Sequence, residues 1–278
     1  MFGKLYICAT PIGNLSDITL RVLDTLKSVD LIAAEDTRHT LKLLNHFDIK
    51  KPLISYFEHN KQYKGIKIIE ELKSGKNVAL VSDAGTPVIS DPGEQLVKEC
   101  IENGIEIESL PGACAAITAM TLCGLDSKRF IFYGFLSHKK QDKINELEKI
   151  KNIKYTIVFY EAPHKLKSTL ECIKEVFGER RVAILRELTK IHEEVLRISV
   201  SDAIEHYNEK EPKGEYVLCV SGFEESEEAF DLFSDMTIEE HIDYYVEKGF
   251  NKKEAIKKCA DDRNLSKREV YNMVMIKD

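Results

Sequence analysis

The stretch from Val78 to Gly93, VALVSDAGTPVISDPG, decides how the rest of the chain is interpreted. Its apolar start, Val78–Val81, predicts a buried strand. The next twelve residues hold two glycines, two prolines, two aspartates, two serines and a threonine. Glycine permits positive φ and proline fixes φ, so this composition specifies a loop of defined shape. Because open α/β sheets bind ligands beyond the carboxyl ends of their strands, we expect a ligand-binding loop; the alternative is a tight turn without a ligand.

Outward from this stretch, strands alternate with helices along the chain. The apolar spacing after the loop, at Leu96, Val97 and Cys100, predicts a helix with Ser90 or Asp91 as its N-cap. The expected strands are 5–9, 30–34, 53–56, 78–81, 105–109, 130–136, 155–160, 181–185 and 216–220. Strands separated by helices indicate βαβ units with right-handed crossovers, and therefore an α/β fold.

Length and composition indicate a protein of more than one domain. The chain has 278 residues, of which 43% are apolar. No apolar run approaches the roughly 18 residues that a membrane span needs. The N-terminus enters a strand-like segment directly and lacks a secretory apolar region. The seven cysteines form no CxxC pair, which predicts reduced, buried thiols in a cytoplasmic protein and no metal site.

Charge is distributed unevenly, and its pattern contributes to the expected domain boundaries. The net charge is −7 at pH 7, which argues against general affinity for nucleic acid. Residues 248–278, however, carry nine Lys or Arg and five Asp or Glu. We expect α/β domains over 1–122 and 123–225, followed by a helical tail over 226–278 that is basic in its second half. The alternative interpretation of the basic tail is a solvated helix surface.

Familiar catalytic motifs are missing from the sequence. It contains no GxSxG, no GxxxxGK[ST], no HExxH, and no GxGxxG after the first strand, so nothing indicates a serine hydrolase, a P-loop enzyme or a Rossmann dehydrogenase. Instead, polar or glycine-rich loops follow several strands, at 11–14, 35–38, 83–91, 111–115, 161–164 and 186–190. Such loops suit a cofactor that main-chain groups hold, with an adenine ring against neighbouring apolar residues.

Eight ordered segments carry a resemblance to a known family. They are LYICATPIGNLSDIT, AAEDTRHT, VALVSDAGTPVISDPG, PGACAAITA, FIFYGFL, YEAPHKL, LRELTKIHEE and PKGEYVL. Together they resemble the tetrapyrrole-methylase (class III) methyltransferase superfamily, and within it the branch that methylates ribosomal RNA of the small subunit. The resemblance runs from about Lys4 to Gly222.

The resemblance implies a fold, a reaction and partners. The fold would be two α/β domains with the cofactor in the cleft between them, plus a small C-terminal helical appendage. The enzyme would use S-adenosyl-L-methionine, yield S-adenosyl-L-homocysteine, and methylate the ribose 2′-oxygen of a decoding-region cytidine in 16S rRNA. Its RNA partner would be presented within the small ribosomal subunit, and the enzyme would be a homodimer.

The resemblance also implies the residues of the cofactor site. They are Pro11, Ala84, Gly85, Thr86, Ile89, Cys114, Ala115, Tyr160, Glu161, Ala162 and Leu188. Two departures stand out. Cys114 replaces the Ser or Thr of many relatives and keeps only a backbone contact, and Ser137 replaces the proline of a Gly-Phe-Leu-Pro pattern.

Methyl transfer from a sulfonium is an in-line displacement, and a ribose hydroxyl is a poor nucleophile without proton removal. The candidate catalytic residues are Glu35, Asp36, Arg38, Glu187 and Lys190, with Asp83, Arg186 and Glu193 as further charged groups at strand ends. A salt bridge or a loop cap is an equal alternative for each of them.

Three other functions remain open at this stage. A small-molecule tetrapyrrole methylase would share the fold but would not need AEDTR, YEAPHK or a basic tail. A diphthamide-pathway methylase would act on a protein imidazole. A non-catalytic RNA-binding assembly factor would keep the pocket without its activity.

Overall fold

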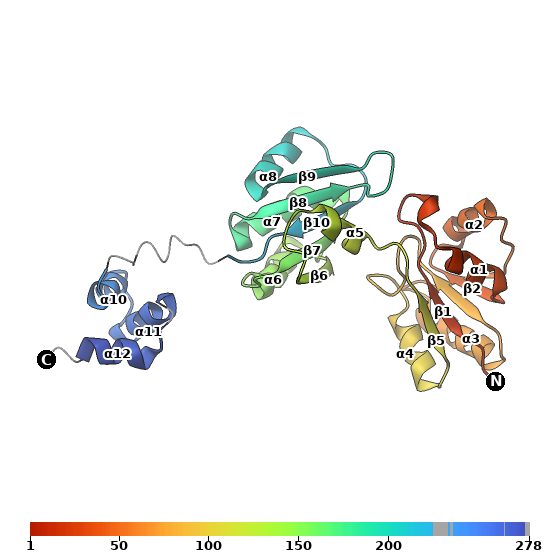
Figure 1. Ribbon diagram of the computed structural model, residues 1–278, viewed down its shortest axis with the longest axis horizontal. Helices are drawn as coiled ribbons and strands as arrows, with labels where there is room; N and C mark the ends of the chain where they lie inside the picture. Colours follow the sequence, from red (N-terminus) through yellow and green to blue (C-terminus); the bar gives the residue numbers. More distant parts are fainter. Residues whose placement is uncertain (225–232, 234–235, 264, 276–278) are drawn as a thin grey trace. The chain divides into compact units, whose positions relative to one another are not determined.

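The computed structural model describes residues 1–224, 233, 236–263 and 265–275 and divides into two compact units, Met1–Phe223 and Glu224–Asp278 (Figure 1). The expected start of the tail at residue 226 lies outside the described residues. No helix in the described ranges is long and apolar enough to cross a membrane. The expected domain boundaries remain predictions.

The first half of the larger unit is a five-stranded parallel sheet with the order β3-β2-β4-β1-β5. Its strands are β1 (Leu5–Cys8), β2 (Leu31–Ala34), β3 (Leu53–Ser55), β4 (Val78–Val81) and β5 (Ile107–Leu110). The helices between them are α1 (Leu20–Ser28), α2 (Thr37–His46), α3 (Lys61–Lys73) and α4 (Glu94–Glu102), with a 3₁₀ turn η1 (Leu15–Asp17) after β1. Residues from α1 and α2 share one core cluster, and residues from α3 and α4 share another, which places one helix pair on each face. Strand β4 is consequently buried along its whole length.

Strands β1 and β4 are neighbours at the centre of this sheet. From β1 the chain continues through α1 to β2, whereas from β4 it continues through α4 to β5, on the other side of β1. Connections that leave adjacent strands in opposite directions open a crevice at their carboxyl ends. The two loops are joined there, because the Thr10 N–H donates to the Gly85 carbonyl at 2.8 Å and the Gly85 N–H donates to Thr10 at 3.0 Å.

The second half of the larger unit is a mixed five-stranded sheet with the order β6-β7-β10-β8-β9. Its strands are β6 (Phe130–Phe135), β7 (Thr156–Glu161), β8 (Arg181–Arg186), β9 (Glu194–Ser199) and β10 (Tyr216–Val220). Helices α6 (Lys140–Ile150), α7 (Pro163–Phe177) and α8 (Val200–Glu209) share the core of one face, and α5 (Ala115–Leu122) packs on the other (Figure 1). Only β6 and β7 form the expected parallel pair; β10 is antiparallel to both of its neighbours. Strand β9 was not predicted, because its half-buried edge position leaves only a weak apolar pattern.

The predicted N-cap of α4 is wrong. The helix begins at Glu94 after Gly93, whose φ is 146°, and no side chain caps it. The preceding loop coils through Val88 and Ser90, both with positive φ, and this conformation turns Asp91 toward a cavity instead of the helix. By contrast, the preceding helix has an ordinary C-terminal cap, since Ser74 is the C-cap of α3 and Gly75 has φ 94°.

The smaller unit contains α10 (Ile238–Glu247), α11 (Lys252–Asp262) and α12 (Lys267–Met275). They enclose a small core that includes Ile242, Ile256 and Val270. The last helix begins with reciprocal capping bonds, because the Glu269 N–H donates to the Ser266 hydroxyl at 3.2 Å and the Ser266 N–H donates to the Glu269 carboxylate at 2.7 Å.

Candidate functional site

A cavity of about 440 Å³ lies at the carboxyl ends of β1 and β4 and is closed by loops of the second sheet. The first sheet contributes Ile12, Glu35 and the loop after β4. The second sheet contributes the ends of β6, β7 and β8 and the start of β10. The volume is within the range of small-molecule sites, and the mixture of apolar residues with few charged groups is typical of them.

Ten of the eleven predicted cofactor residues line this cavity, which are Ala84, Gly85, Thr86, Ile89, Cys114, Ala115, Tyr160, Glu161, Ala162 and Leu188. Pro11 does not line it; its neighbour Ile12 does. The structure therefore brings together residues that lie as far as 104 positions apart, from Ala84 to Leu188. Their contacts with a cofactor remain a prediction.

Glycine and threonine fix the wall that the β4 loop forms. Gly85 has φ 84°, and an added Cβ would lie 3.3 Å from Ile12 Cγ2. The Thr86 hydroxyl donates to the Ala113 carbonyl at 3.1 Å and so ties this loop to the segment that leads into α5. Cys114 is the N-cap of α5, but its side chain accepts no capping bond.

The opposite wall is built on Tyr160 and Glu161. The Tyr160 hydroxyl accepts the Ala116 N–H at 3.1 Å, and burial raises its pKa. Glu161 is 3% exposed and accepts hydrogen bonds from the Ala162 N–H at 2.9 Å and from the Thr169 hydroxyl. The buried Lys143 ammonium donates to the same hydroxyl at 2.6 Å. Thr169 thus links two buried groups that carry opposite charges. Burial of either charge without the other would be costly.

Three carboxylates, Glu35, Asp83 and Asp91, give the cavity an acidic side. Burial, followed by the nearby Glu35 charge, raises the pKa of Asp91 to about 7. Burial and the Asp83 charge also raise the pKa of Glu35. Asp83 itself accepts the Asp36 N–H at 3.0 Å and holds the turn after β2. Repelling carboxylates in a cavity are relieved by a bound cation.

Of the predicted catalytic residues, only Glu35 lines the cavity. Asp36 is the N-cap of α2, where it accepts the Arg38 N–H at 2.8 Å and pairs with the Arg38 guanidinium at 2.7 Å. Hydrogen bonds from Arg38 hold the pKa of Asp36 well below its usual range. The Arg38 side chain is 88% exposed.

Glu187 and Lys190 belong to a polar network beside the cavity. The Lys190 ammonium lies 2.9 Å from both Glu187 Oε1 and Glu215 Oε2, and Glu187 also accepts the Glu215 N–H at 2.9 Å. Burial raises the pKa of Glu187, but these donors outweigh it and the net shift is downward. Neither residue lines the cavity, although Leu188 between them does. Their catalytic roles remain predictions.

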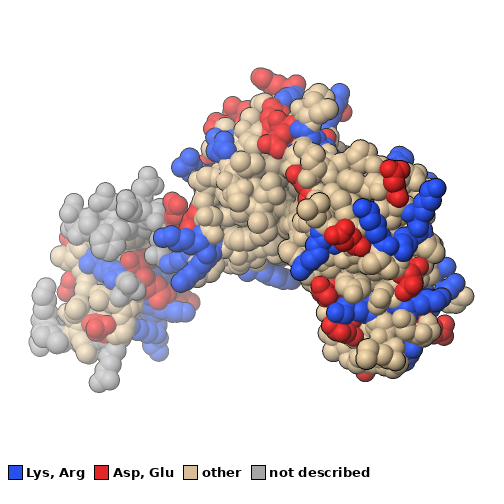
Figure 2. Space-filling model, turned by 45° about the vertical axis from the view of Figure 1, so that its right-hand side comes forward, with Lys and Arg blue, Asp and Glu red and all other residues tan. Residues whose placement is uncertain are grey.

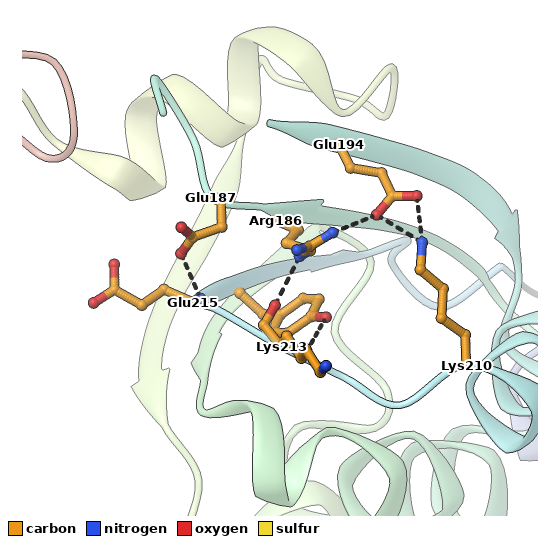
Figure 3. Close-up of polar contacts among 7 residues, drawn as sticks. Arg186, Glu187, Glu194, Lys210, Lys213 and Glu215 are labelled. Carbon is orange, nitrogen blue, oxygen red and sulfur yellow. Dashed lines mark hydrogen bonds and ion pairs between the residues drawn. The ribbon is translucent and has the colours of Figure 1, made fainter. Parts of the chain in front are cut away.

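The same network continues across the sheet (Figure 3). Arg186 pairs with Glu194 at 3.2 Å and donates to the Lys213 carbonyl at 2.7 Å, while Lys210 pairs with Glu194 at 2.9 Å. The Lys213 N–H donates to the Tyr216 hydroxyl at 3.1 Å. These contacts fix the segment that leads into β10. Glu215 at the end of this segment lines the cavity, as do Tyr216 and Val217 at the start of β10.

Sequence reasoning missed several residues of the lining, namely Ile12, Phe135, Leu185, Glu215, Tyr216 and Val217. The segment PKGEYVL contains three of them and carried the family resemblance, so a signal was present without an assignment. Asp91, which the sequence suggested only as a helix cap, also faces the cavity.

Comparison with known proteins places the chain in a family. Residues 4–204 match the family model of Tetrapyrrole (Corrin/Porphyrin) Methylases. The chain is 52% identical, over 99% of its length and 95% of the relative, to Ribosomal RNA small subunit methyltransferase I of Bacillus subtilis. The chain belongs to the ribosomal RNA small subunit methyltransferase I family of tetrapyrrole methylases. The family resemblance and the expected fold are thereby confirmed.

Two further matches delimit what is shared. The relative of the same name from Thermotoga maritima is 50% identical, and 80% of this chain covers 100% of it. That relative therefore has no counterpart of the remaining fifth. A structure of uroporphyrin-III C-methyltransferase from Thermus thermophilus, complexed with S-adenyl homocysteine, matches 79% of this chain and 97% of its own with a TM-score of 0.58. At 13% identity, this likeness concerns the fold alone.

The acidic cavity predicts a stability effect of Asp91→Asn. When folding raises the pKa of a carboxyl from 3.8 to about 7, ionisation of that carboxyl destabilises the folded state. The free energy of unfolding therefore falls as pH rises through this window. The gain in stability from Asp91→Asn should therefore be larger at pH 8 than at pH 5 by about 2 kcal/mol, since solvent in the cavity reduces the full effect.

The measurement is urea unfolding at both pH values, with Asp24→Asn on the exposed surface of α1 as the control. An equal change at pH 5 and pH 8, or a change that Asp24→Asn reproduces, would contradict the buried-carboxylate explanation.

Proposed function

We propose that this methyltransferase transfers a methyl group from S-adenosyl-L-methionine to the ribose 2′-oxygen of a decoding-region cytidine in 16S rRNA. The observation that carries the proposal is the 52% identity, over nearly the whole chain, to a protein named for methylation of small-subunit ribosomal RNA. The 2′-oxygen and the cytidine are implied by the sequence resemblance and are the finer part of the proposal.

The residues of the cavity fit S-adenosylmethionine. Small residues, among them Ala84, Gly85, Ala115 and Ala162, leave backbone groups accessible to polar parts of the cofactor. Buried Leu185 and Val217 supply apolar surface for an adenine ring. The carboxylates of Glu35, Asp83 and Asp91 match the positive charges of its sulfonium and amino groups.

The cofactor supplies a methyl group activated by a sulfonium. The chain must hold the ribose hydroxyl in line with that methyl group and accept its proton. Among the candidate residues, Glu35 best suits the second role, because it faces the cavity and its raised pKa makes it a better proton acceptor than an exposed carboxylate. Asp36 and Arg38 then position Glu35 by fixing the turn between β2 and α2.

Contact with RNA would use basic groups outside the cavity. On the face drawn in Figure 2, Lys and Arg occur side by side with Asp and Glu on the larger unit, so this face has no single sign of charge. Candidate contacts are Arg38 and Lys42, the lysines of 139–154 apart from the buried Lys143, and the exposed Lys252, Lys253 and Lys257 of α11. Because every residue that lines the cavity belongs to the larger unit, we assign the tail to RNA binding and not to the chemistry.

We further propose a cytoplasmic homodimer that acts on the small ribosomal subunit. An exposed apolar groove supports the dimer. Its lining is Ile117, Met120, Thr121, Gly124, Leu125, Ser127 and Phe130. Such a groove at α5 is a surface that a second copy of the chain would cover.

The decisive experiment is mass spectrometry of small-subunit rRNA from a strain that lacks this protein. We expect the decoding-region cytidine to lose its 2′-O-methyl group and to regain it when the gene is restored. Full methylation of that cytidine in the deletion strain would overturn the proposed function.

Gly85→Val should abolish binding of S-adenosylmethionine in isothermal titration calorimetry. A β-branched residue at φ 84° costs on the order of 1–3 kcal/mol, and its side chain would push against Ile12 in the cavity wall. Gly104→Val is the matched control, because Gly104 also has positive φ, at 67°, but nothing lies near its added Cβ. The control should lose comparable stability and bind normally. Equal binding by both variants would show that the β4 loop is only a turn and does not bind the cofactor.

Glu35→Gln should lower kcat by about 10²- to 10⁴-fold, the usual range for removal of a general base, with a much smaller loss of cofactor affinity, because Asp83 and Asp91 remain in the cavity. Asp36→Asn removes a charge one residue away but retains a good N-cap, so its kcat should remain close to the wild-type value. The test is single-turnover methylation of small subunits that lack the modification. The reverse ranking of the two variants would assign the proton acceptor to Asp36.

A further inference from the structure

A β-bulge controls which side chain of β6 faces the cavity. Phe132 pairs with Val158 and Gly134 pairs with Phe159, so Tyr133 and Gly134 together oppose one residue of β7. Gly134 has φ 82°, a conformation that glycine adopts without strain and that locally redirects the strand. Successive residues of a strand alternate between faces, and the extra residue moves Phe135 onto the same face as Tyr160. Without the bulge, Phe135 would point to the opposite face of the sheet.

Phe135 occupies an unusual position for a phenylalanine. It lines the cavity and contacts Tyr160 edge to face, with ring centroids 5.5 Å apart, yet it is 54% exposed. Its surroundings are nonetheless fixed. The following Ser137 donates its hydroxyl to Glu146 at 2.5 Å and its N–H to the same carboxylate at 3.2 Å, which anchors the end of the strand to α6.

We propose that Phe135 is the platform on which the nucleobase of the target nucleotide stacks at the mouth of the cavity. This inference rests on the proposed function and adds the residue that receives the base. Enzymes that read single nucleotides of RNA stack unpaired bases on aromatic rings. A ring held in place by a bulge and an anchored strand end, but open to solvent, meets this need.

The cofactor is the other aromatic group that could meet this ring. An adenine needs a dry surface, which Leu185 and Leu188 provide deeper in the cavity, being 0% and 6% exposed. Phe135 instead is more than half exposed to solvent, and a basic residue lies near it along the chain. The Lys165 ammonium lies 3.2 Å from Nε2 of His138, three residues beyond Phe135. The positive Lys165 ammonium suits a nucleotide that is attached to a phosphate backbone.

The test compares variants of the full-length protein with small ribosomal subunits that lack the modification. Stacking of one base is worth about 1–3 kcal/mol, so Phe135→Ala should lower kcat/KM for the subunits about tenfold or more. Phe135→Tyr retains the ring and should keep most of the activity. Both variants should bind S-adenosylmethionine in calorimetry as the wild type does. Phe2→Ala is the matched control, since Phe2 is 51% exposed but precedes β1 at the opposite end of the strand from the cavity.

Each alternative outcome is decisive. If the wild type methylates the subunits and Phe135→Ala is equally active, this inference is overturned and the proposed function stands. A loss of cofactor affinity that matches the loss of kcat/KM would assign the ring to the cofactor and also overturn it. A wild-type protein that does not methylate the subunits overturns the proposed function, and this inference falls with it.

Discussion

The pairing of β1 with β4 is the constraint on which the rest of the larger unit depends. These parallel neighbours send their chains to opposite sides of the sheet, and reciprocal hydrogen bonds between Thr10 and Gly85 hold the two departing loops together. The cavity begins at this point, and Ile12 and the β4 loop form its wall. The second sheet completes an enclosure whose position the first sheet has already determined.

The sequence predicted the elements better than their arrangement. Val78–Val81 appears in the structure with the expected bounds, because a short apolar run before a Gly/Pro-rich loop is a local signal. Strand order is not local, so nothing near β10 indicated that it would lie between β7 and β8. The N-cap of α4 was mispredicted for a related reason, since Asp91 has the chemistry of a cap but the loop turns it into the cavity.

Site residues could be predicted where the residue type within a motif determines the role. They could not be predicted where the role depends on the three-dimensional position of the side chain. The family resemblance supplied ten lining residues, whereas composition alone indicated only a loop that binds a ligand. Phe135 could not be found in this way, because its exposure depends on the conformation of Gly134. Glu187 and Lys190 illustrate the converse. Their charges suggested a catalytic role. In the structure, Lys190 instead forms ion pairs with Glu187 and Glu215.

The two sheets of the larger unit come from separate, contiguous parts of the chain: β1–β5 lie within residues 5–110 and β6–β10 within 130–220. During synthesis, every strand of the first sheet can therefore leave the ribosome before any strand of the second, and domains generally fold as units in that order. The cavity does not exist until Val217 is in place, close to the end of the larger unit. A ligand of this cavity can consequently bind only after nearly all of the larger unit has been synthesised.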